Sequence, residues 1–256
     1  MSVPFTIVIP ARLRSERLPD KPLADLAGAP LVVRVWERAM AADAAEVWVA
    51  VDDASIADAC AAHGASAVMT SPDCASGTDR LAEVARARGW DEDTIVVNLQ
   101  GDEPLVPIDL AGRLARALSD DPGVGVSTAA APIRAAVDLA TESIVKVVCD
   151  ARGRALYFSR APIPWVRGRA PDAPLPDDVP FLRHVGVYAY RVGTLLRLAG
   201  AERSPLERAE SLEQLRAMHL GIPIAVVRLD EAPPHGVDTP DDLARVRAIF
   251  ERGPTS

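Results

Sequence analysis

Residues 6–22 read TIVIPARLRSERLPDKP, and this stretch decides the fold. Residues 6–9 are an apolar, β-branched run that predicts a buried strand. The run stops at Pro10 and passes into a loop that carries Arg12, Arg14, Arg17 and Lys21. Prolines at positions 10, 19 and 22 stiffen this loop, which a merely solvated loop has little need for. A stiff basic loop after a strand favours a polyphosphate site, because arginine donates in a planar fork and lysine offers a point charge.

Two further apolar runs end in chemically capable residues. Residues 47–51 (VWVAV) stop at Asp52, and residues 95–99 (IVVNL) are followed closely by Asp102. Residues 31–40 place apolar side chains at helical spacing between the first two strands. This alternation of strand and helix predicts an α/β fold with a largely parallel sheet and helices on both faces. In such sheets ligands bind beyond the carboxyl ends of the strands.

The second half of the chain predicts a different arrangement. Residues 145–148 and 155–158 flank a turn and predict a hairpin. The proline-rich residues 162–180 predict an exposed excursion rather than a linker. The elements expected after it are a strand over 185–190, a helix over 206–220 that stops at Gly221, a strand over 224–229 and a final helix opened by residues 239–242. We therefore expect one domain over residues 1–256.

Composition limits the classes of function. The chain has 256 residues, 49% of them hydrophobic, and a net charge of -8. This acidic balance disfavours nucleic-acid binding, which usually needs a basic surface. No apolar run approaches the ~18 residues that span a bilayer, and residues 1–10 lack a basic leader, so we expect no membrane and no export signal. Three widely spaced cysteines fit reduced thiols in a cytoplasm and give no zinc spacing.

Two aspartates have the chemistry to hold a divalent cation. Asp102 lies in NLQGDEP after a buried strand, and Asp238 lies in GVDTP before the final helix. Each alone is explained better by a turn or a helix cap. Together with the basic loop they fit Mg²⁺, which takes one or two protein carboxylates plus substrate phosphates. The hypothesis requires both carboxyl groups to meet near Lys21.

Two other groups of polar residues are candidates for ligand contacts. Ser76 and Gly77 open SGTDR, which fits a helix N-cap and equally a site that reads a base edge, because helix N-termini present free N–H groups. His184 and Tyr188 are four residues apart on one predicted strand and share a face. Arg160, Glu213 and Gln214 are further polar candidates in the second half of the chain, but spacing alone does not bring them together with this pair. His184 by itself is better explained as a structural histidine.

In order, these segments resemble the CMP-Kdo synthetases, the cytidylyltransferases of 3-deoxy-manno-octulosonate (Kdo). The similarity covers about residues 7–247. YFSRAPIPW, the FLRHVGVYAYR stretch and ESLEQLR distinguish Kdo from other acceptors. The other matching stretches are IPARLRSERLPDKPLADLAGAPLVVRVWERA, SGTDRLAEV, VVNLQGDEPLVP, VKVVCDARGRA, AMHLG and GVDTPDDLARVR.

The resemblance implies an activity and an architecture. The activity is transfer of CMP from CTP to Kdo with release of pyrophosphate, with Mg²⁺ as cofactor, for lipopolysaccharide synthesis in the cytoplasm. The fold is a Rossmann-like nucleotidyltransferase fold with a mixed, mostly parallel sheet and a small dimerisation excursion, and the protein is a homodimer. Residues of about 1–130 form the CTP-binding half, 131–222 the sugar-binding and dimerisation portion, and 223–256 the return to the main sheet.

The resemblance also implies roles residue by residue. The catalytic residues are Lys21, Arg12, Asp102 and Asp238, of which the two aspartates hold the metal. The CTP-binding residues are Ala11, Arg12, Arg17, Lys21, Ser76, Gly77, Arg80 and Gln100. The sugar-binding residues are Arg160, His184, Tyr188, Glu213 and Gln214. The sequence departs from the family at Asp20, where glycine is usual, at Asp79, which replaces a common glutamate, and at His235, where a small residue is common.

Other functions are less well supported by the sequence. A cytidylyltransferase for sialic acid or an 8-amino Kdo analogue is the nearest rival, and an acceptor panel separates it. A non-catalytic nucleotide-binding regulator has no need of Asp102, Asp238 and Lys21 together. A dinucleotide-dependent oxidoreductase is disfavoured because no GxGxxG motif occurs.

Overall fold

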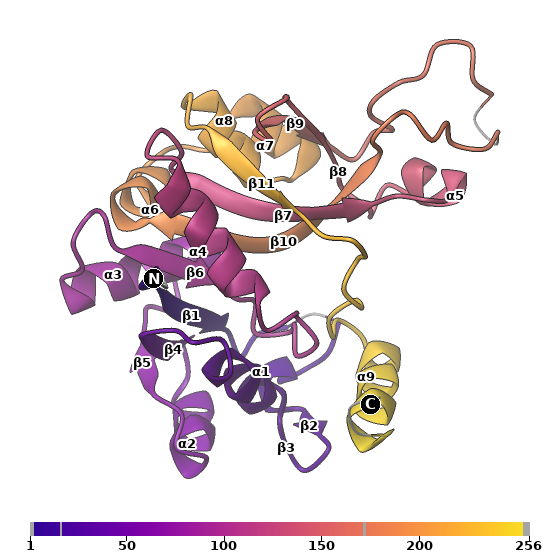
Figure 1. Ribbon diagram of the computed structural model, residues 1–256. Coiled ribbons are helices and arrows are strands. Elements are labelled where there is room, and N and C mark those ends of the chain that lie inside the picture. Colours follow the sequence, from indigo (N-terminus) through magenta and orange to yellow (C-terminus); the bar gives the residue numbers. More distant parts are fainter. Residues whose placement is uncertain (1–2, 16, 171–172, 253–256) are drawn as a thin grey trace.

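The computed structural model describes residues 3–15, 17–170 and 173–252 (Figure 1). Within these ranges, nine strands form one sheet, whose main order is β11-β7-β10-β6-β1-β4-β5, with β8 paired to β10 and β9 paired to β8. The strands of the main order are β1 Thr6–Ala11, β4 Glu46–Val51, β5 Ala67–Met69, β6 Ile95–Asn98, β7 Val126–Pro132, β10 Leu182–Arg191 and β11 Ile224–Arg228.

One half of the sheet is parallel, as the first three apolar runs predict. β1 lies between β4 and β6 and runs parallel to both, and β5 extends this half beyond β4. Ala11 pairs with Val51 at the last position of the two strands. The polar residues that follow β1, β4 and β6 therefore meet at one edge of the sheet.

The other half makes the sheet mixed. β10 is antiparallel to β6 and to β7, whereas β11 is parallel to β7. β10 is longer than the predicted strand over 185–190 and is irregular between Val185 and Tyr188. The predicted hairpin is confirmed as β8 Lys146–Cys149 and β9 Ala155–Ser159, with Gly153 at φ 77° in its turn.

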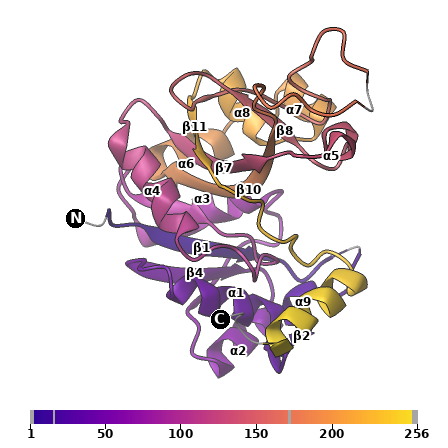
Figure 2. The ribbon, with the colours of Figure 1, turned by 45° about the vertical axis from the view of Figure 1, so that its right-hand side comes forward.

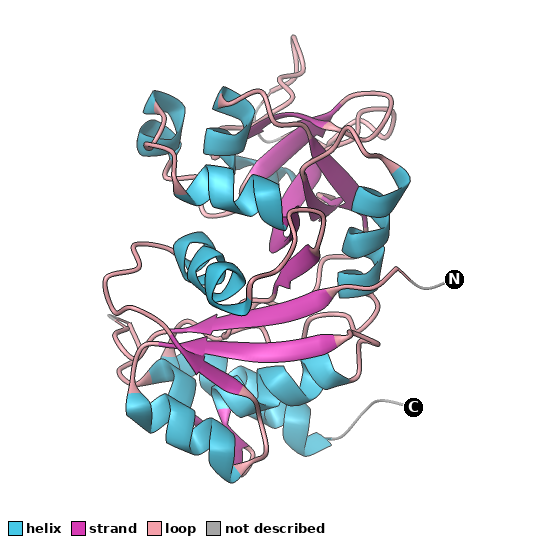
Figure 3. Ribbon diagram, turned by 90° about the vertical axis from the view of Figure 1, so that its left-hand side faces the viewer, coloured by secondary structure: helices cyan, strands magenta, loops and turns pink. Residues whose placement is uncertain are grey.

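Helices cover both faces of the sheet (Figure 3). One core joins the sheet to α1, α2 and α4, and the opposite core joins it to α3, α6 and α8. The bounds of the first group are α1 Leu31–Met40, α2 Ala54–Ala62 and α4 Leu110–Asp120. Those of the second are α3 Gly77–Arg88, α6 Val192–Ala199 and α8 Gln214–His219. The shorter elements are η1 Lys21–Leu23, β2 Asp25–Leu26, β3 Ala29–Pro30 and α5 Ala136–Ala140.

The predicted continuous helix over residues 206–220 is wrong. The chain forms α7 Pro205–Glu210 and then α8, and Ser211 between them has φ 52°. A left-handed residue cannot continue a right-handed helix, so α7 ends there. Leu212 is buried just after this break. The apolar spacing of the two short helices resembles one helix, which explains the error.

The last helix returns to the first half of the molecule. After β11 the chain crosses to α9 Pro240–Arg252, which lies beside β2 and α1 (Figure 2). Val237 and Val246 are fully buried there in a small core with Leu26 and Leu31. This packing fixes the segment that carries Asp238.

The proline-rich segment between β9 and β10 projects from the body of the molecule (Figure 1), as predicted, although residues 171–172 of it lie outside the described ranges. Across the part of the chain that the structure describes, no helix combines the length and apolarity needed to cross a membrane.

Candidate active site

Asp102 and Asp238, 136 positions apart in the sequence, both contact one positively charged side chain, that of Lys21. The ammonium Nζ of Lys21 donates to Asp102 Oδ2 at 2.5 Å and to Asp238 Oδ1 at 3.1 Å. Arg17 also pairs with Asp238, at 3.0 Å. Burial opposes the charge of Lys21, but the contacts with Asp102 and Asp238 outweigh it and raise its pKa. The structure thus brings together the three side chains that the metal hypothesis requires.

Backbone contacts explain how these distant aspartates meet. A Cβ on Gly101 would lie 2.8 Å from the carbonyl oxygen of Pro10, so only glycine lets this chain pass the end of β1. A Cβ on Gly236 would lie 2.5 Å from the carbonyl oxygen of Asp102. The next residue, Val237, donates its N–H to that same oxygen at 2.8 Å. Close packing of three segments therefore sets the positions of both carboxylates.

The donor set fits a divalent cation bound together with phosphates. Within residues 3–15, 17–170 and 173–252, no group of three or more His, Cys, Asp or Glu side chains is arranged to hold a metal alone. Two carboxylates that already share one cation partner match Mg²⁺, which takes one or two protein carboxylates and completes its shell with phosphate and water. Burial and the charges of Asp102 and Asp238 raise the pKa of neighbouring Glu103 to about 7.

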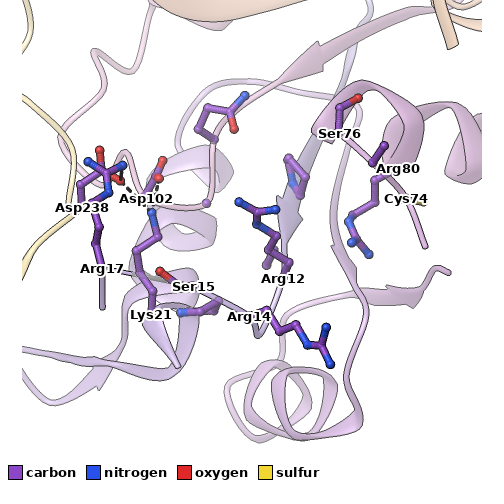
Figure 4. Close-up of a pocket in the computed structure, with 17 residues that line it drawn as sticks. Arg12, Arg14, Ser15, Arg17, Lys21, Cys74, Ser76, Arg80, Asp102 and Asp238 are labelled. Carbon is purple, nitrogen blue, oxygen red and sulfur yellow. Dashed lines mark hydrogen bonds and ion pairs between the residues drawn. The ribbon is translucent and has the colours of Figure 1, made fainter. Parts of the chain in front are cut away.

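A cavity of about 480 Å³ extends from these carboxylates along the basic loop. Figure 4 shows Arg17, Lys21, Asp102 and Asp238 on one side, Ser76 and Arg80 on the other, and Arg12 between them. The residues that line the cavity are Pro10, Ala11, Arg12, Arg14, Ser15, Arg17, Lys21, Pro22, Cys74, Ala75, Ser76, Gly77, Arg80, Gln100, Gly101, Asp102 and Asp238.

Two arginines in the basic loop are exposed and have no carboxylate partner among the described residues. Arg12 and Arg14 form neither an ion pair nor a side-chain hydrogen bond with the residues that the structure describes. Their charges are thus directed toward the cavity and solvent. Asp20, at a position where the resemblance leads us to expect glycine, has φ 51°, a conformation that glycine adopts freely and aspartate tolerates. The departure therefore preserves the turn that leads into Lys21.

The opposite wall is the start of α3. Ser76 is its N-cap and accepts the N–H of Asp79 at 3.2 Å, so the cap that the sequence suggested is present. Gly77 follows at the helix start and lines the cavity. Arg80, one turn further on, is buried and donates to Thr70 and to Asp52. The helix N-terminus therefore faces the basic loop across the cavity.

A second, smaller cavity of about 180 Å³ adjoins the first. Gly77 and Gln100 line both cavities and so form their boundary. The remaining lining of the second cavity comes from β6, β7, β10, α3, α6 and α8: Thr78, Asn98, Val126, Tyr188, Tyr190, Leu198, Glu213, Gln214, Arg216 and Ala217. Three predicted sugar-binding residues, Tyr188, Glu213 and Gln214, are therefore gathered in one place.

The polar groups of the second cavity are largely desolvated. Burial raises the pKa of Glu213, against its hydrogen bond with Thr78 and the charge of Arg216. Its Oε1 accepts from Ser76 Oγ at 3.2 Å, which links the two cavities directly. The Nε2 atom of Gln214 is buried and has no hydrogen-bond partner among the described residues. A buried, unpaired amide NH2 group in a cavity is suited to donate a hydrogen bond to a ligand oxygen.

Two predicted sugar ligands lie behind or outside this cavity. His184 packs against Tyr188, with ring centroids 5.3 Å apart, and its Nε2 lies 2.9 Å from Thr128 Oγ1. Burial lowers the pKa of His184 to about 3, so the ring is neutral. Arg160 lies outside both cavities as the described residues line them, and its guanidinium donates to the backbone oxygens of Glu210 and Glu142. Its role as a ligand stays a prediction.

Sequence reasoning left several site residues unassigned. Asn98, Thr78 and Tyr190 line the second cavity, and Asp52 supports the first from behind. Asn98 and Asp52 were detectable in principle, because both lie at the carboxyl end of a parallel strand. Thr78 and Tyr190 gave no signal, since each also fits a plain helix or strand.

Comparisons with known proteins place this geometry in context. A family model described as cytidylyltransferase matches residues 6–224. One similar solved structure is that of CMP:2-keto-3-deoxy-manno-octonic acid synthetase complexed with CTP. It is 44% identical, covers 98% of this chain and 100% of its own, and has a TM-score of 0.89. A cytidylyltransferase from Leptospira borgpetersenii serovar Hardjo-bovis (strain JB197) is 16% identical over 98% of this chain and 88% of its own, with a TM-score of 0.64, which shows a shared fold.

Proposed function

Because the chain belongs to the cytidylyltransferase family and, within it, to the CMP-Kdo synthetases, we propose that it transfers CMP from CTP to Kdo. The products are CMP-Kdo and pyrophosphate. One observation carries the proposal: a cation-lined cavity that ends at two carboxylates opens, at Gly77 and Gln100, onto a smaller cavity of mainly uncharged polar and aromatic groups, in which Glu213 and Arg216 pair at 3.8 Å. Two reactants placed in these cavities meet at their boundary.

The reaction joins two anions, so charge neutralisation is its main requirement. The anomeric hydroxyl of Kdo attacks the α-phosphorus of CTP, and the bond from that phosphorus to the leaving pyrophosphate oxygen breaks. Lys21, Arg12 and Arg17 neutralise the triphosphate, and the polar groups around Ser76, Gly77, Arg80 and Gln100 hold the nucleoside. The backbone at Ala11, which lines the cavity, lets the phosphates approach the end of β1. Fixed charges aimed at developing negative charge lower the barrier most effectively.

Mg²⁺ is the proposed cofactor, and Asp102 and Asp238 hold it. The support is that both carboxylates converge on one cationic partner at hydrogen-bonding distance. When bound, Mg²⁺ supplies electrostatic stabilisation to the phosphates and acidifies a hydroxyl group close to it. Lys21, which lies between the carboxylates, then remains available to the phosphate oxygens.

The second cavity is the proposed acceptor site. Glu213, Gln214 and Tyr188 read the hydroxyl groups of the sugar acid, and His184 supports the ring of Tyr188 from behind. Arg160 is proposed to pair with the sugar carboxylate. This role requires its guanidinium to leave the backbone oxygens of Glu210 and Glu142.

The wider biological setting follows from the same proposal. A CMP-Kdo synthetase works in the cytoplasm and supplies lipopolysaccharide synthesis. We propose a homodimer that pairs through the excursion after β9, with residues of about 1–130 serving CTP, 131–222 the acceptor and dimerisation, and 223–256 the return of Asp238. Trp165 and Val137, which are 72% and 70% exposed near that excursion, are compatible with such pairing.

An acceptor panel tests the proposed function. Pyrophosphate release from CTP is measured with Kdo, 8-amino Kdo and sialic acid, each with Mg²⁺ and with a chelator. We expect Mg²⁺-dependent release with Kdo and little with sialic acid. Release with another acceptor and none with Kdo would overturn the assignment of the substrate. Binding of CTP without turnover of any acceptor would instead favour a regulatory protein.

A further inference from the structure

Asp52 lies behind the first cavity, which is the proposed CTP site and is called the nucleotide cavity below. It is the first residue after β4, whose last residue, Val51, pairs with the last residue of β1. Its side chain is only 12% exposed. Asp52 therefore lies where the basic loop leaves the sheet, on the adjacent strand.

The two carboxylate oxygens of Asp52 serve different walls of the cavity. Oδ1 accepts the backbone N–H of Leu13 at 2.9 Å. Oδ2 accepts from Nη2 of Arg80 at 3.1 Å. Leu13 lies in the basic loop between the two exposed arginines Arg12 and Arg14, whereas Arg80 belongs to α3 on the opposite wall. One carboxylate thus connects the proposed phosphate loop to the proposed nucleoside wall.

The energetics of this connection favour a fixed arrangement. The Arg80 side chain is 4% exposed, and its second amino group donates to Thr70 Oγ1. Removing the charge of Asp52 leaves a buried guanidinium with only a neutral partner, which is costly. Hydrogen bonds to charged groups are also stronger than neutral ones and hold their donors more tightly. The Leu13 amide is therefore tied to a carboxylate that is itself held in place.

We propose that Asp52 is a positioning residue that sets the arginine-bearing loop against α3 and thereby shapes the site for the triphosphate. The inference rests on the proposed function, because it takes the first cavity as the CTP site. Asp52 does not touch the nucleotide; it acts through Leu13, whose neighbour Arg12 faces the cavity, and through Arg80, which lines it.

Asp52→Asn is the direct test. Leu13 and Arg80 donate to different oxygens of Asp52, and the amide replaces one of these oxygens with an NH2 donor, so one of the two bonds is lost. We expect affinity for CTP and for inorganic tripolyphosphate to fall about tenfold, the effect of one lost hydrogen bond to a charged group. The KM for CTP rises by a similar factor, while the KM for Kdo stays at the wild-type value. A purely structural role would instead lower the folded fraction and leave both KM values unchanged.

Two matched variants locate the effect. Asp53→Asn changes the next carboxylate, which caps α2 through Ser55, and we expect wild-type affinity for CTP and tripolyphosphate. Thr70→Val removes the other partner of Arg80 but leaves the bonds of Asp52 to Arg80 and to Leu13 in place, so binding of tripolyphosphate should remain within about twofold of the wild type, below the loss expected for a hydrogen bond to a charged group. A loss of tripolyphosphate binding in Thr70→Val equal to that in Asp52→Asn would overturn the role of the Leu13 contact.

Two further outcomes decide the proposal. Folded Asp52→Asn with wild-type affinity for both ligands would overturn it, whereas an unaltered protein that binds neither CTP nor tripolyphosphate would overturn the proposed function itself. Amide hydrogen exchange at Leu13 in the unaltered protein provides a test that needs no variant. We expect protection of this amide, and rapid, unprotected exchange would contradict its bond to Asp52.

Discussion

The two adjoining cavities are built from opposite kinds of polar group. The first cavity, the proposed nucleotide site, is lined by formal charges, with Arg12, Arg14 and Lys21 on its basic loop and the Asp102–Asp238 pair at its end. The second cavity, the proposed acceptor site, is lined mainly by aromatic, hydroxyl and amide groups from β10, α3 and α8, and its two charged residues, Glu213 and Arg216, pair with each other. Burial raises the pKa of both Tyr188 and Tyr190, so their hydroxyls stay protonated.

The positive charge that lines the acceptor cavity is already paired. Arg216 lines it, but its guanidinium bonds to Glu207 at 2.9 and 2.5 Å, and both side chains are 6% exposed. Glu213 lies 3.8 Å from the same arginine. The cavity therefore presents directional hydrogen-bonding groups and little free positive charge. From this difference we infer that the charges of the two reacting anions are neutralised mainly in the proposed nucleotide cavity. The proposed acceptor cavity then recognises the shape and the hydroxyl groups of the sugar.

The largest expected effect comes from breaking the charged side. Asp102→Asn removes one of the two charges that meet at Lys21 but keeps the size of the side chain. We expect kcat for pyrophosphate release to fall on the order of 10³-fold, the upper range for loss of one preorganised electrostatic contact. Far-UV circular dichroism should remain unchanged.

Asp109→Asn is a matched control for this substitution, because Asp109 lies just before α4 and its side chain, among the described residues, forms only an exposed pair with Arg113 at 3.5 Å. Its activity should equal that of the wild type. Activity of Asp102→Asn near the wild-type value would remove the metal role of this aspartate and with it the contrast between the cavities.

A smaller effect is expected on the neutral side. Glu213→Gln keeps the shape and one acceptor oxygen but removes the carboxylate charge that the second cavity is proposed to offer to the sugar hydroxyls. We expect the KM for Kdo to rise about tenfold, as for one lost hydrogen bond to a charged group, with little change in the KM for CTP. Steady-state kinetics with each substrate varied in turn measure both values. A rise confined to the KM for CTP would show that the second cavity does not hold the acceptor.

The sequence predicted the nucleotide side better than the acceptor side, for a physical reason. Arg12, Lys21, Asp102 and Ser76 follow or precede strands and helices whose apolar periodicity is plain. Because parallel strands deliver their carboxyl ends to one edge, the position of these residues in the sequence already implies their proximity. The meeting of Asp238 with Asp102 depends in addition on the close approaches at Gly101 and Gly236, which spacing alone does not reveal.

The acceptor side depends on features that periodicity does not encode. Glu213 and Gln214 reach the cavity because the predicted helix over 206–220 breaks at Ser211, where the left-handed backbone gives no residue-type signal. The resemblance grouped Arg160 with them, but its guanidinium donates to the backbone oxygens of Glu210 and Glu142. Long-range side-chain contacts of this kind require the tertiary structure.

The neutral character of the acceptor side also predicts a pH dependence of stability. Burial lowers the pKa of His184 to about 3, below its ordinary value of 6.5, so the folded state holds the ring neutral while the unfolded chain binds a proton below pH 6.5. Its contribution to stability is complete above that pH and is lost as pH falls from 6.5 toward 3. Urea unfolding of His184→Gln should therefore show a shallower loss of stability over this range than the wild type.

His63→Gln, at the exposed end of α2, is the control and should keep the wild-type slope. The same slope in His184→Gln and the wild type would show that the ring is not held neutral by the fold. The acceptor side would then carry a titratable charge near neutral pH, and its contrast with the nucleotide side would weaken.

The smallest expected effect compares the same capping motif on the two sides. At the start of α9, the N–H of Thr239 donates to Asp242 Oδ2 at 3.1 Å, and the N–H of Asp242 donates to Thr239 Oγ1 at 3.2 Å. Ser204 and Glu207 form the same reciprocal pair of bonds at the start of α7. Thr239→Ala should cost about 1 kcal/mol of unfolding free energy, and Ser204→Ala about 2 kcal/mol. The difference arises because Ser204 and Glu207 are buried, and Glu207 also neutralises Arg216. Equal losses in urea unfolding would show that burial of the second motif adds nothing, and that the balanced charges beside the acceptor cavity are not coupled to the cap of α7.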